Sequence, residues 1–245
     1  MTVKFVNSDM DINIYKNTEE CNKNLAKYLI DKYLSKNKNI AISGGSTPIG
    51  LFKSILKLIK KKSVIKSNFF WVDERCVSPK SKESNYGEAN RHFFSKLNID
   101  KKKIYRIKGE NDAEREAIDY SKILNSKVET INNIISLDLC LLGIGEDGHT
   151  ASIFPYELKK LNNINTCVVG TNPDSGQKRV SLSINQINNS KEVIIQACGK
   201  GKKIVVDNIL SQRNNYLDYP ASYVKPKNKK LSWYLDFDSA GNYMN

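Results

Sequence analysis

The chain is poor in the features that mark membrane, secreted and disulfide-bonded proteins. No apolar run approaches the roughly 18 uninterrupted residues that a membrane-spanning helix needs. Residues 1–15 contain no apolar core of the kind found in secretory signals. The five cysteines are widely spaced and include no C-x-x-C pair, which fits neither a disulfide framework nor a zinc site. We therefore expect a protein of the reducing cytoplasm.

Arginine is also scarce, and this bears on the strong positive charge. The 245 residues include 39 basic and 26 acidic side chains, a net charge of +13, yet only six of the basic residues are arginines. The lysines are spread along the whole chain, whereas proteins that recognise nucleic acids use arginine for bidentate contacts. We therefore expect no nucleic-acid partner and no membrane partner. The positive field would instead attract small phosphorylated substrates.

Short apolar segments alternate with amphipathic segments of helical length. The segments with strand length and strand composition are 39–43, 68–72, 137–144 and 192–198. The helices expected between them cover 18–34, 48–61, 85–97, 112–132 and 201–210. This alternation predicts one α/β domain over residues 1–245, with a mostly parallel central sheet and helices on both faces in a doubly wound, Rossmann-like arrangement. Ligands of such sheets bind beyond the carboxyl ends of the strands.

The segment after the first predicted strand has the composition of a phosphate-binding turn. Gly44 and Gly45 allow the backbone to approach a ligand closely and to adopt positive φ. Ser46 or Thr47 can cap the next helix, and Pro48 suits its first turn. N–H groups, hydroxyls and the helix dipole would then converge on an anion such as phosphate. The alternative is a plain glycine-rich turn before a capped helix.

Charged side chains follow the other predicted strands. Asp73, Glu74 and Arg75 come directly after the second strand, where Arg75 is placed to bind phosphate and the acids could orient it or handle protons. The alternative is an ordinary surface ion pair, which contributes little. Arg179 begins a further alternating run, and Lys202 follows the fourth strand. Each of these two residues is a candidate anion ligand.

Residues 145–152 form the segment richest in chemistry. A glycine-rich turn holds His149, one of two histidines, with Asp147 two residues before it. An imidazole with an ordinary pKa of about 6.5 suits general-base work, and a nearby carboxylate can fix its tautomer. The alternative is a histidine that caps a turn. The second histidine, His92, stands beside two phenylalanines in a predicted helix, as packed or surface histidines do.

Motifs of several other enzyme classes are missing. The chain has no G-x-S-x-G nucleophile turn and no H-E-x-x-H or H-x-x-E-H metal set. The glycine-rich turn at 43–48 lacks the G-K-[ST] ending of a Walker A loop. We therefore predict a site without metal or cofactor.

Taken together, the motifs resemble those of the 6-phosphogluconolactonase family, within the superfamily that also holds glucosamine-6-phosphate deaminase. They occur in the family order over nearly the whole chain, as SGGSTP (43–48), WVDERCVSP (71–79), SNYGEANR (84–91), LLGIGEDGHTASIFP (141–155), RVSLS (179–183), G-x-x-K (199–202) and PASYVKP…LSWYLD (220–236). The segment around His149 is highly specific. The deaminase branch resembles D-E-Y and G-H-I-G-F-N-E-P, whereas this chain has Arg75 and GHTASIFP, which favour the lactonase branch.

The resemblance implies hydrolysis of 6-phospho-D-glucono-1,5-lactone to 6-phosphogluconate, in the oxidative pentose phosphate pathway. It implies that His149 activates water, that Asp147 orients His149, and that residues 153–155 close the site. The implied substrate and phosphate contacts are Gly44, Gly45, Ser46, Thr47, Asp73, Arg75, Arg179 and Lys202. The oxyanion would be held by N–H groups near 44–45 or 145–148, or by a cation. A functional association with glucose-6-phosphate dehydrogenase is a further expectation.

Three alternatives stay open at this point. A deaminase-like enzyme of the same fold would use Asp73 as base and release ammonia from glucosamine-6-phosphate. A non-catalytic sugar-phosphate sensor would keep the phosphate turn but would not need His149. A basic nucleic-acid binder would lose affinity steeply with salt.

Overall fold

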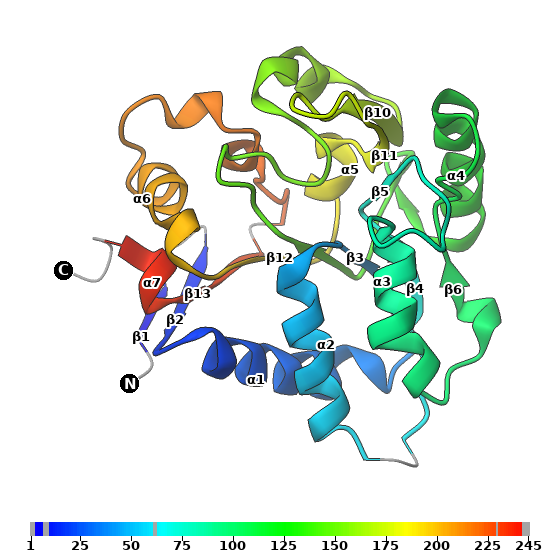
Figure 1. Cartoon of the computed structure of the whole chain (residues 1–245), viewed down its shortest axis with the longest axis horizontal. Coiled ribbons are helices and arrows are strands. Elements are labelled where there is room, and N and C mark those ends of the chain that lie inside the picture. Colours follow the sequence, from blue (N-terminus) through cyan, green and yellow to red (C-terminus); the bar gives the residue numbers. More distant parts are fainter. Residues whose placement is uncertain (1–2, 7–9, 61–62, 229, 242–245) are drawn as a thin grey trace.

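An eight-stranded sheet runs through the computed structural model, which describes residues 3–6, 10–60, 63–228 and 230–241 (Figure 1). Its strand order is β1-β2-β13-β12-β9-β3-β4-β6. The bounds are β1 Val3–Val6, β2 Asp11–Tyr15, β3 Asn39–Ile42, β4 Asn68–Trp71, β6 Ile104–Tyr105, β9 Leu139–Leu142, β12 Val193–Ala197 and β13 Leu231–Asp236. All neighbouring pairs from β2 to β6 are parallel, and β1 adds an antiparallel edge. The predicted α/β fold with a mostly parallel sheet is confirmed.

Helices cover both faces of this sheet. Figure 1 shows α1 and α2 on one side and α5 and α6 on the other. The α-helices are α1 Thr18–Leu29, α2 Ser46–Leu58, α3 Asn85–His92, α4 Ala113–Lys127, α5 Ile184–Asn188, α6 Lys203–Ser211 and α7 Phe237–Ala240. A π-helical turn, η1 Ile30–Leu34, continues α1, and the 3-10 turns are η2 Phe94–Lys96, η3 Lys101–Lys103, η4 Pro155–Asn162, η5 Lys200–Lys202, η6 Tyr216–Asp218 and η7 Pro220–Tyr223. Among the residues described, no helix is both long and apolar enough to cross a membrane.

Each of the four predicted strand segments contains a strand, because a parallel strand covered on both faces forms a continuous apolar run. The strands β2 and β13 were not predicted. In β2 the polar side chain of Asn13 interrupts the apolar pattern, yet it is buried and donates to the carbonyl of Trp233 at 3.3 Å. A buried polar group that is satisfied by a distant strand gives no local signal in the sequence.

Three helix boundaries differ from the prediction for local reasons. Helix α2 begins at Ser46, with Gly45 as its N-cap at φ +94° and without a side-chain cap, so the expected cap by Ser46 or Thr47 is wrong. Helix α3 ends at His92, where Phe93 leaves the helical region at φ −138°. Helix α4 ends at Lys127 rather than near residue 132.

A small hairpin replaces the expected end of α4. Its strands are β7 Thr130–Ile131 and β8 Ile134–Ile135, paired antiparallel. Asn132 and Asn133 connect them with φ of +53° and +61°. Two consecutive positive φ values are the requirement of a tight hairpin turn, and asparagine tolerates them better than most residues.

A second, antiparallel sheet stands beyond the carboxyl end of β4. It consists of β10 Cys167–Thr171, β11 Lys178–Leu182 and β5 Asp73–Arg75, in that order. Val72 joins the two sheets, because its N–H donates to the carbonyl of Ile42 at 3.0 Å and its carbonyl accepts from Leu182 N–H at 2.7 Å. The chain therefore passes from the parallel sheet directly into the small one, which carries residues 73–75.

The opposite end of the parallel sheet is held by a buried carboxylate. Glu192, at the amino end of β12, is 1% exposed. It accepts hydrogen bonds from the hydroxyls of Tyr28 at 2.5 Å and Tyr33 at 2.6 Å, and it forms ion pairs with Lys32 and, at 3.1 Å, with Lys230. Burial alone would raise the pKa of Glu192, but these four donors outweigh it and hold the pKa below its ordinary value.

Replacement of Glu192 should therefore cost stability. We expect Glu192→Gln to lower the free energy of unfolding by about 2–3 kcal/mol at pH 7, because two phenols and two ammonium groups lose their anionic acceptor. A carboxylate whose pKa is lower in the folded state than in the unfolded state stabilises the fold at any pH above its unfolded-state pKa. This contribution is lost as the pH falls through its folded-state pKa. Urea unfolding should therefore show a smaller difference in unfolding free energy between the wild type and Glu192→Gln in acid than at pH 7. Glu129→Gln, which removes an exposed ion pair with Lys191, is the matched control and should change little. An equal loss of unfolding free energy in Glu192→Gln and Glu129→Gln would contradict a stabilising role for the buried Glu192.

Candidate active site

Most of the candidate residues meet at one cavity of about 180 Å³. It lies at the carboxyl ends of the strands, as expected for an open α/β sheet. The candidates that line it are Gly44, Gly45, Thr47, Asp73, Arg75, His149, Arg179 and Lys202. Asp147 does not line the cavity and instead contacts His149. The backbone of Ser46 opens α2, but its side chain lies outside the described part of the chain.

The start of α2 forms one wall. With Gly45 as the N-cap, Ser46 and Thr47 occupy the first helical turn, where N–H groups lack intrahelical acceptors. Gly44 lies against the side chain of Asn85, because a Cβ atom at Gly44 would stand 1.8 Å from Asn85 Oδ1. A side chain at position 44 would therefore displace Asn85, and a glycine there permits this close approach of α3.

His149 and Asp147 form a hydrogen-bonded pair. Nδ1 of His149 is 2.6 Å from Oδ1 of Asp147, and the same oxygen accepts the backbone N–H of His149 at 3.1 Å. Burial would raise the pKa of Asp147, but its hydrogen bond with His149 outweighs this and lowers the pKa below its ordinary value. An ionised carboxylate can only accept, so Nδ1 carries the proton and Nε2 presents the lone pair.

The Phe154 ring contacts both His149 and Arg179, two residues that line the cavity. Its ring centroid is 5.0 Å from that of His149, and the guanidinium of Arg179 stands 5.5 Å from the Phe154 centroid. The ring itself is 1% exposed. Phe154 is therefore a buried support that contacts both groups, and the expectation that residues 153–155 close the site stays a prediction.

Two arginines occupy directly opposed positions in the small sheet. Arg179 on β11 pairs in register with Arg75 on β5. The Nε atoms of both are buried, with no hydrogen-bond partner in the part of the chain that the structure describes. Burial and the neighbouring charge of Arg75 lower the pKa of Arg179. Opposed like charges destabilise a sheet, and an anion between them would relieve the repulsion.

Glu74 has a structural position behind the site. Its carboxylate accepts the N–H groups of Asn85 at 2.7 Å and Tyr86 at 2.8 Å and the Ser84 hydroxyl at 2.9 Å, so it caps the N-terminus of α3. Burial raises the pKa of Glu74, although these hydrogen bonds oppose the shift. The surface ion pair considered from the sequence is thus wrong, because Glu74 is buried and contacts α3.

Asn85 and Ser152 are contributors that the sequence analysis did not identify as part of the site. Asn85 lines the cavity and donates from Nδ2 to the Asp73 carbonyl at 2.8 Å and to Asp73 Oδ1 at 3.3 Å. The Ser152 hydroxyl donates to Asp73 Oδ2 at 2.7 Å. Together they orient the Asp73 carboxylate. Asn85 stands at the start of the predicted helix 85–97, and only its contact with Asp73 and the cavity marks it as a site residue.

Other groups considered from the sequence lie elsewhere. His92, at the end of α3, faces Glu88, with Nε2 3.2 Å from Oε2, and it does not line the cavity. Across the described ranges, no three His, Cys, Asp or Glu side chains are grouped so that they could hold a metal ion.

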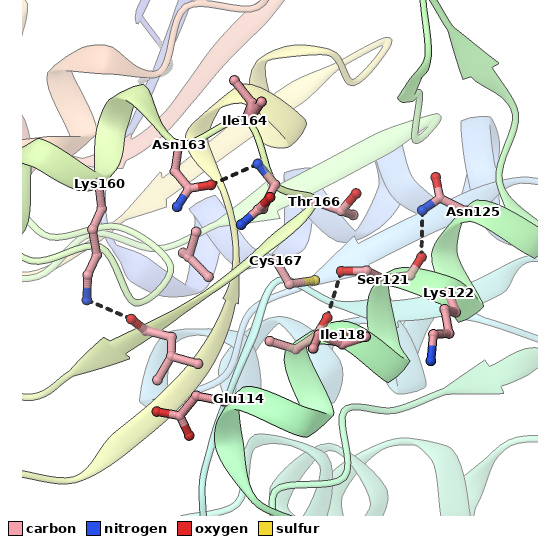
Figure 2. A pocket seen from close by; sticks show the side chains of 14 residues that line it. Glu114, Ile118, Ser121, Lys122, Asn125, Lys160, Asn163, Ile164, Thr166 and Cys167 are labelled. Carbon is pink, nitrogen blue, oxygen red and sulfur yellow. Dashed lines mark hydrogen bonds between the residues drawn. The ribbon is translucent and has the colours of Figure 1, made fainter.

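A larger hollow of about 690 Å³ lies between α4 and the β10 edge (Figure 2). Its charged side chains already have protein partners. Lys160 pairs with Glu157 and donates to the Val169 carbonyl at 2.6 Å, and Glu114 pairs with Lys178 at 2.7 Å. It contains neither histidine nor arginine among its described lining residues, so we assign no chemistry to it.

Comparison with known proteins agrees with this geometry. A 6-phosphogluconolactonase of Aggregatibacter actinomycetemcomitans is 34% identical over 216 residues, covering 87% of this chain and 91% of that protein. The human GDH/6PGL endoplasmic bifunctional protein is 30% identical over 209 residues, which span 82% of this chain and 26% of that protein.

Solved structures superpose closely. The devB protein has a TM-score of 0.89 at 36% identity, covering 94% of this chain and 98% of the other. The 6-phosphogluconolactonase of Trypanosoma brucei has a TM-score of 0.79 at 26% identity, covering 94% and 97%. The sequence model described as glucosamine-6-phosphate isomerases/6-phosphogluconolactonase matches residues 16–233. The chain therefore belongs to the glucosamine-6-phosphate isomerase/6-phosphogluconolactonase family.

Proposed function

We propose that this chain hydrolyses 6-phospho-D-glucono-1,5-lactone to 6-phosphogluconate, in the oxidative pentose phosphate pathway. The observation that carries the proposal is the location of His149, with its partner Asp147, and of two half-buried arginines around one cavity. Such a cavity combines a base for water with a site for a phosphate. Relatives named 6-phosphogluconolactonase that match most of the chain support the same activity.

The base acts at one end of the sugar. Nε2 of His149 removes a proton from water, and the resulting hydroxide attacks the lactone carbonyl carbon, C1. The tetrahedral intermediate then collapses, the bond from C1 to the ring oxygen breaks, and the imidazolium returns its proton to that oxygen. The ionised Asp147 stabilises the imidazolium between these steps. A lactone ester is already electrophilic, so water and one base suffice without a covalent nucleophile.

The anion contacts lie at the other end. Arg75, Arg179, Lys202 and the first turn of α2 at Thr47 are our phosphate and substrate ligands, with Asp73 accepting from sugar hydroxyls. Ser46 belongs to the same turn. Binding the remote phosphate aligns C1 with His149, and such positioning supplies much of the rate.

Two of the candidate hydrogen-bond donors for the oxyanion are already occupied within the protein. Within the His149 loop, the N–H of Gly145 donates to the His149 carbonyl at 2.8 Å, and the N–H of Gly148 donates to the Gly145 carbonyl at 3.1 Å. Both groups are therefore engaged by the backbone. We assign the oxyanion to the Gly44–Gly45 backbone or to a cationic side chain that lines the cavity.

Three broader assignments accompany the activity. We propose one α/β domain, supported by one continuous cluster of buried apolar side chains. We propose a cytoplasmic location, supported by five free cysteines. We also propose a functional association with glucose-6-phosphate dehydrogenase, because the human bifunctional relative carries GDH and 6PGL in one protein.

The activity is tested by proton release in a pH-stat. Freshly prepared lactone should be hydrolysed faster than its spontaneous rate. If the wild-type protein matches the spontaneous rate, the proposal fails, and ammonia release from glucosamine-6-phosphate is the next measurement.

His149 provides the first variant. We expect His149→Ala to lower kcat by about 10²–10⁴-fold with a small change in KM, because the general base is lost while the anion contacts remain. His92→Ala removes the other histidine and should keep wild-type kinetics. Full activity of His149→Ala in the pH-stat would overturn the assigned base.

Arg179 provides a variant with opposite effects on binding and stability. We expect Arg179→Gln to raise KM by about 10–100-fold, the value of a charge-assisted hydrogen bond. Its Tm should not fall, because the substitution removes a half-buried charge that faces Arg75. Arg213→Gln, an exposed arginine outside the cavity lining, is the control. Normal KM with a lowered Tm would show that Arg179 is structural.

A further inference from the structure

A second cavity of about 410 Å³ lies between α6, η7 and β13, on the side of η7 away from His149. Its walls are mainly apolar and come from Ile209, Leu210, Ala221, Val224, Leu231 and Trp233. Cavities of this size that have apolar walls and few polar groups are typical of small-molecule sites. The proposed reaction uses none of these residues.

Two of the lining residues carry a buried polar atom that has no hydrogen-bond partner among the described residues. Ser222 is 6% exposed and Trp233 is 1% exposed. The Ser222 hydroxyl and the Trp233 indole N–H are both buried without a hydrogen-bond partner in the described ranges. Buried polar groups are nearly always satisfied in proteins, and both of these groups can donate. Both atoms lie beneath the cavity surface, so the parts of these two residues that line the cavity are apolar.

The rim of the cavity is positively charged. Lys225 and Lys227 line it and are exposed, and its lining residues, as far as the structure describes them, include no aspartate or glutamate. A ligand with an apolar body and an anionic end would match both the walls and the rim.

The turn η7 separates this cavity from the His149 loop. Ala221 and Ser222 line the cavity, while the N–H of Ala221 donates to the Gly148 carbonyl at 3.1 Å. Tyr219 packs against Gly148 so closely that a Cβ atom there would stand 2.3 Å from its ring. The Tyr219 hydroxyl in turn accepts from Asn208 of α6 at 3.2 Å. A shift of η7 would thus change the support of the residue next to His149.

We propose that this cavity is an effector site for a small amphipathic organic anion, an apolar ring system that carries a carboxylate-like group. Its ring lies against Trp233, and its charge lies near Lys225 and Lys227. Occupancy acts on His149 through η7 and Gly148. The binding half of this proposal is independent of the proposed function, and the coupling half rests on it.

The two tryptophans allow a direct test. Trp71 is fully buried in β4 and does not line the cavity, so its indole N–H is an internal control for that of Trp233. We would titrate the full chain with 2-naphthoate and record ¹H–¹⁵N spectra, with Trp233→Phe used for assignment. The Trp233 indole peak and the Gly148 amide peak should shift with the same saturation curve, while the Trp71 peak stays in place.

Substitutions in the cavity test whether 2-naphthoate binds there. Leu210→Trp, which fills the cavity from its half-buried edge, should abolish the shifts. Lys225→Ala combined with Lys227→Ala should weaken 2-naphthoate roughly tenfold, because each lysine contributes a Coulomb attraction of about 1 kcal/mol or less at the surface. The same double substitution should not lower the affinity for 2-naphthol, which is neutral. Lys101→Ala combined with Lys102→Ala removes the same charge on the exposed η3 and is the matched control.

The outcomes separate the claims. A static Trp233 peak, or shifts that persist in Leu210→Trp, would overturn the site. Shifts of Trp233 without Gly148 would support the site and overturn its coupling to His149. Lactone hydrolysis by the unliganded protein is measured separately, so failure of the proposed activity leaves the binding result intact.

Discussion

The candidate site depends on the two hydrogen bonds of Val72. One ties this residue to β3 in the parallel sheet, and the other ties it to β11 in the small antiparallel sheet. Because the strand cannot rotate between these two partners, the next three residues have defined directions. Asp73 faces Asn85 and Ser152, Glu74 caps α3, and Arg75 stands opposite Arg179. The three-residue strand β5 thus places a carboxylate, the start of a helix and a cation near the same cavity.

The charges around this cavity are arranged for a ligand rather than for the free protein. Arg75 and Arg179 face each other, and among the described residues neither Asp73 nor Glu74 forms an ion pair with them. Asp73 is engaged by neutral donors, and Glu74 by the N-terminus of α3. The arginines therefore keep their positive field for an incoming anion. The buried ring of Phe154 contacts both His149, the proposed base, and Arg179, a proposed anion contact.

The sequence predicted the parts of this arrangement that depend on local pattern. Buried parallel strands appeared as apolar runs, and the glycine-rich turns marked their carboxyl ends. The proximity of Asp147 to His149 followed from a separation of two residues. The opposition of Arg75 and Arg179 could not be predicted, because strand register is decided by pairing between segments about a hundred residues apart. The end of α4 was missed because Asn132 and Asn133 adopt a backbone conformation that most residues avoid. Asn85 and Ser152 were missed because each acts on a residue far away in the sequence.

Glu192, with the two tyrosines and two lysines that bind it, lies at the amino end of β12, whereas Lys202 follows the carboxyl end of the same strand. Glu192 and Cys198 are six residue steps apart along this extended chain, or about 20 Å. Interactions that far apart contribute almost additively to stability. The protein can therefore gain thermal resistance through substitutions at the amino ends of its strands without altering the catalytic end. Such a division allows the surface composition of this lysine-rich chain to vary in evolution while its chemistry stays constant.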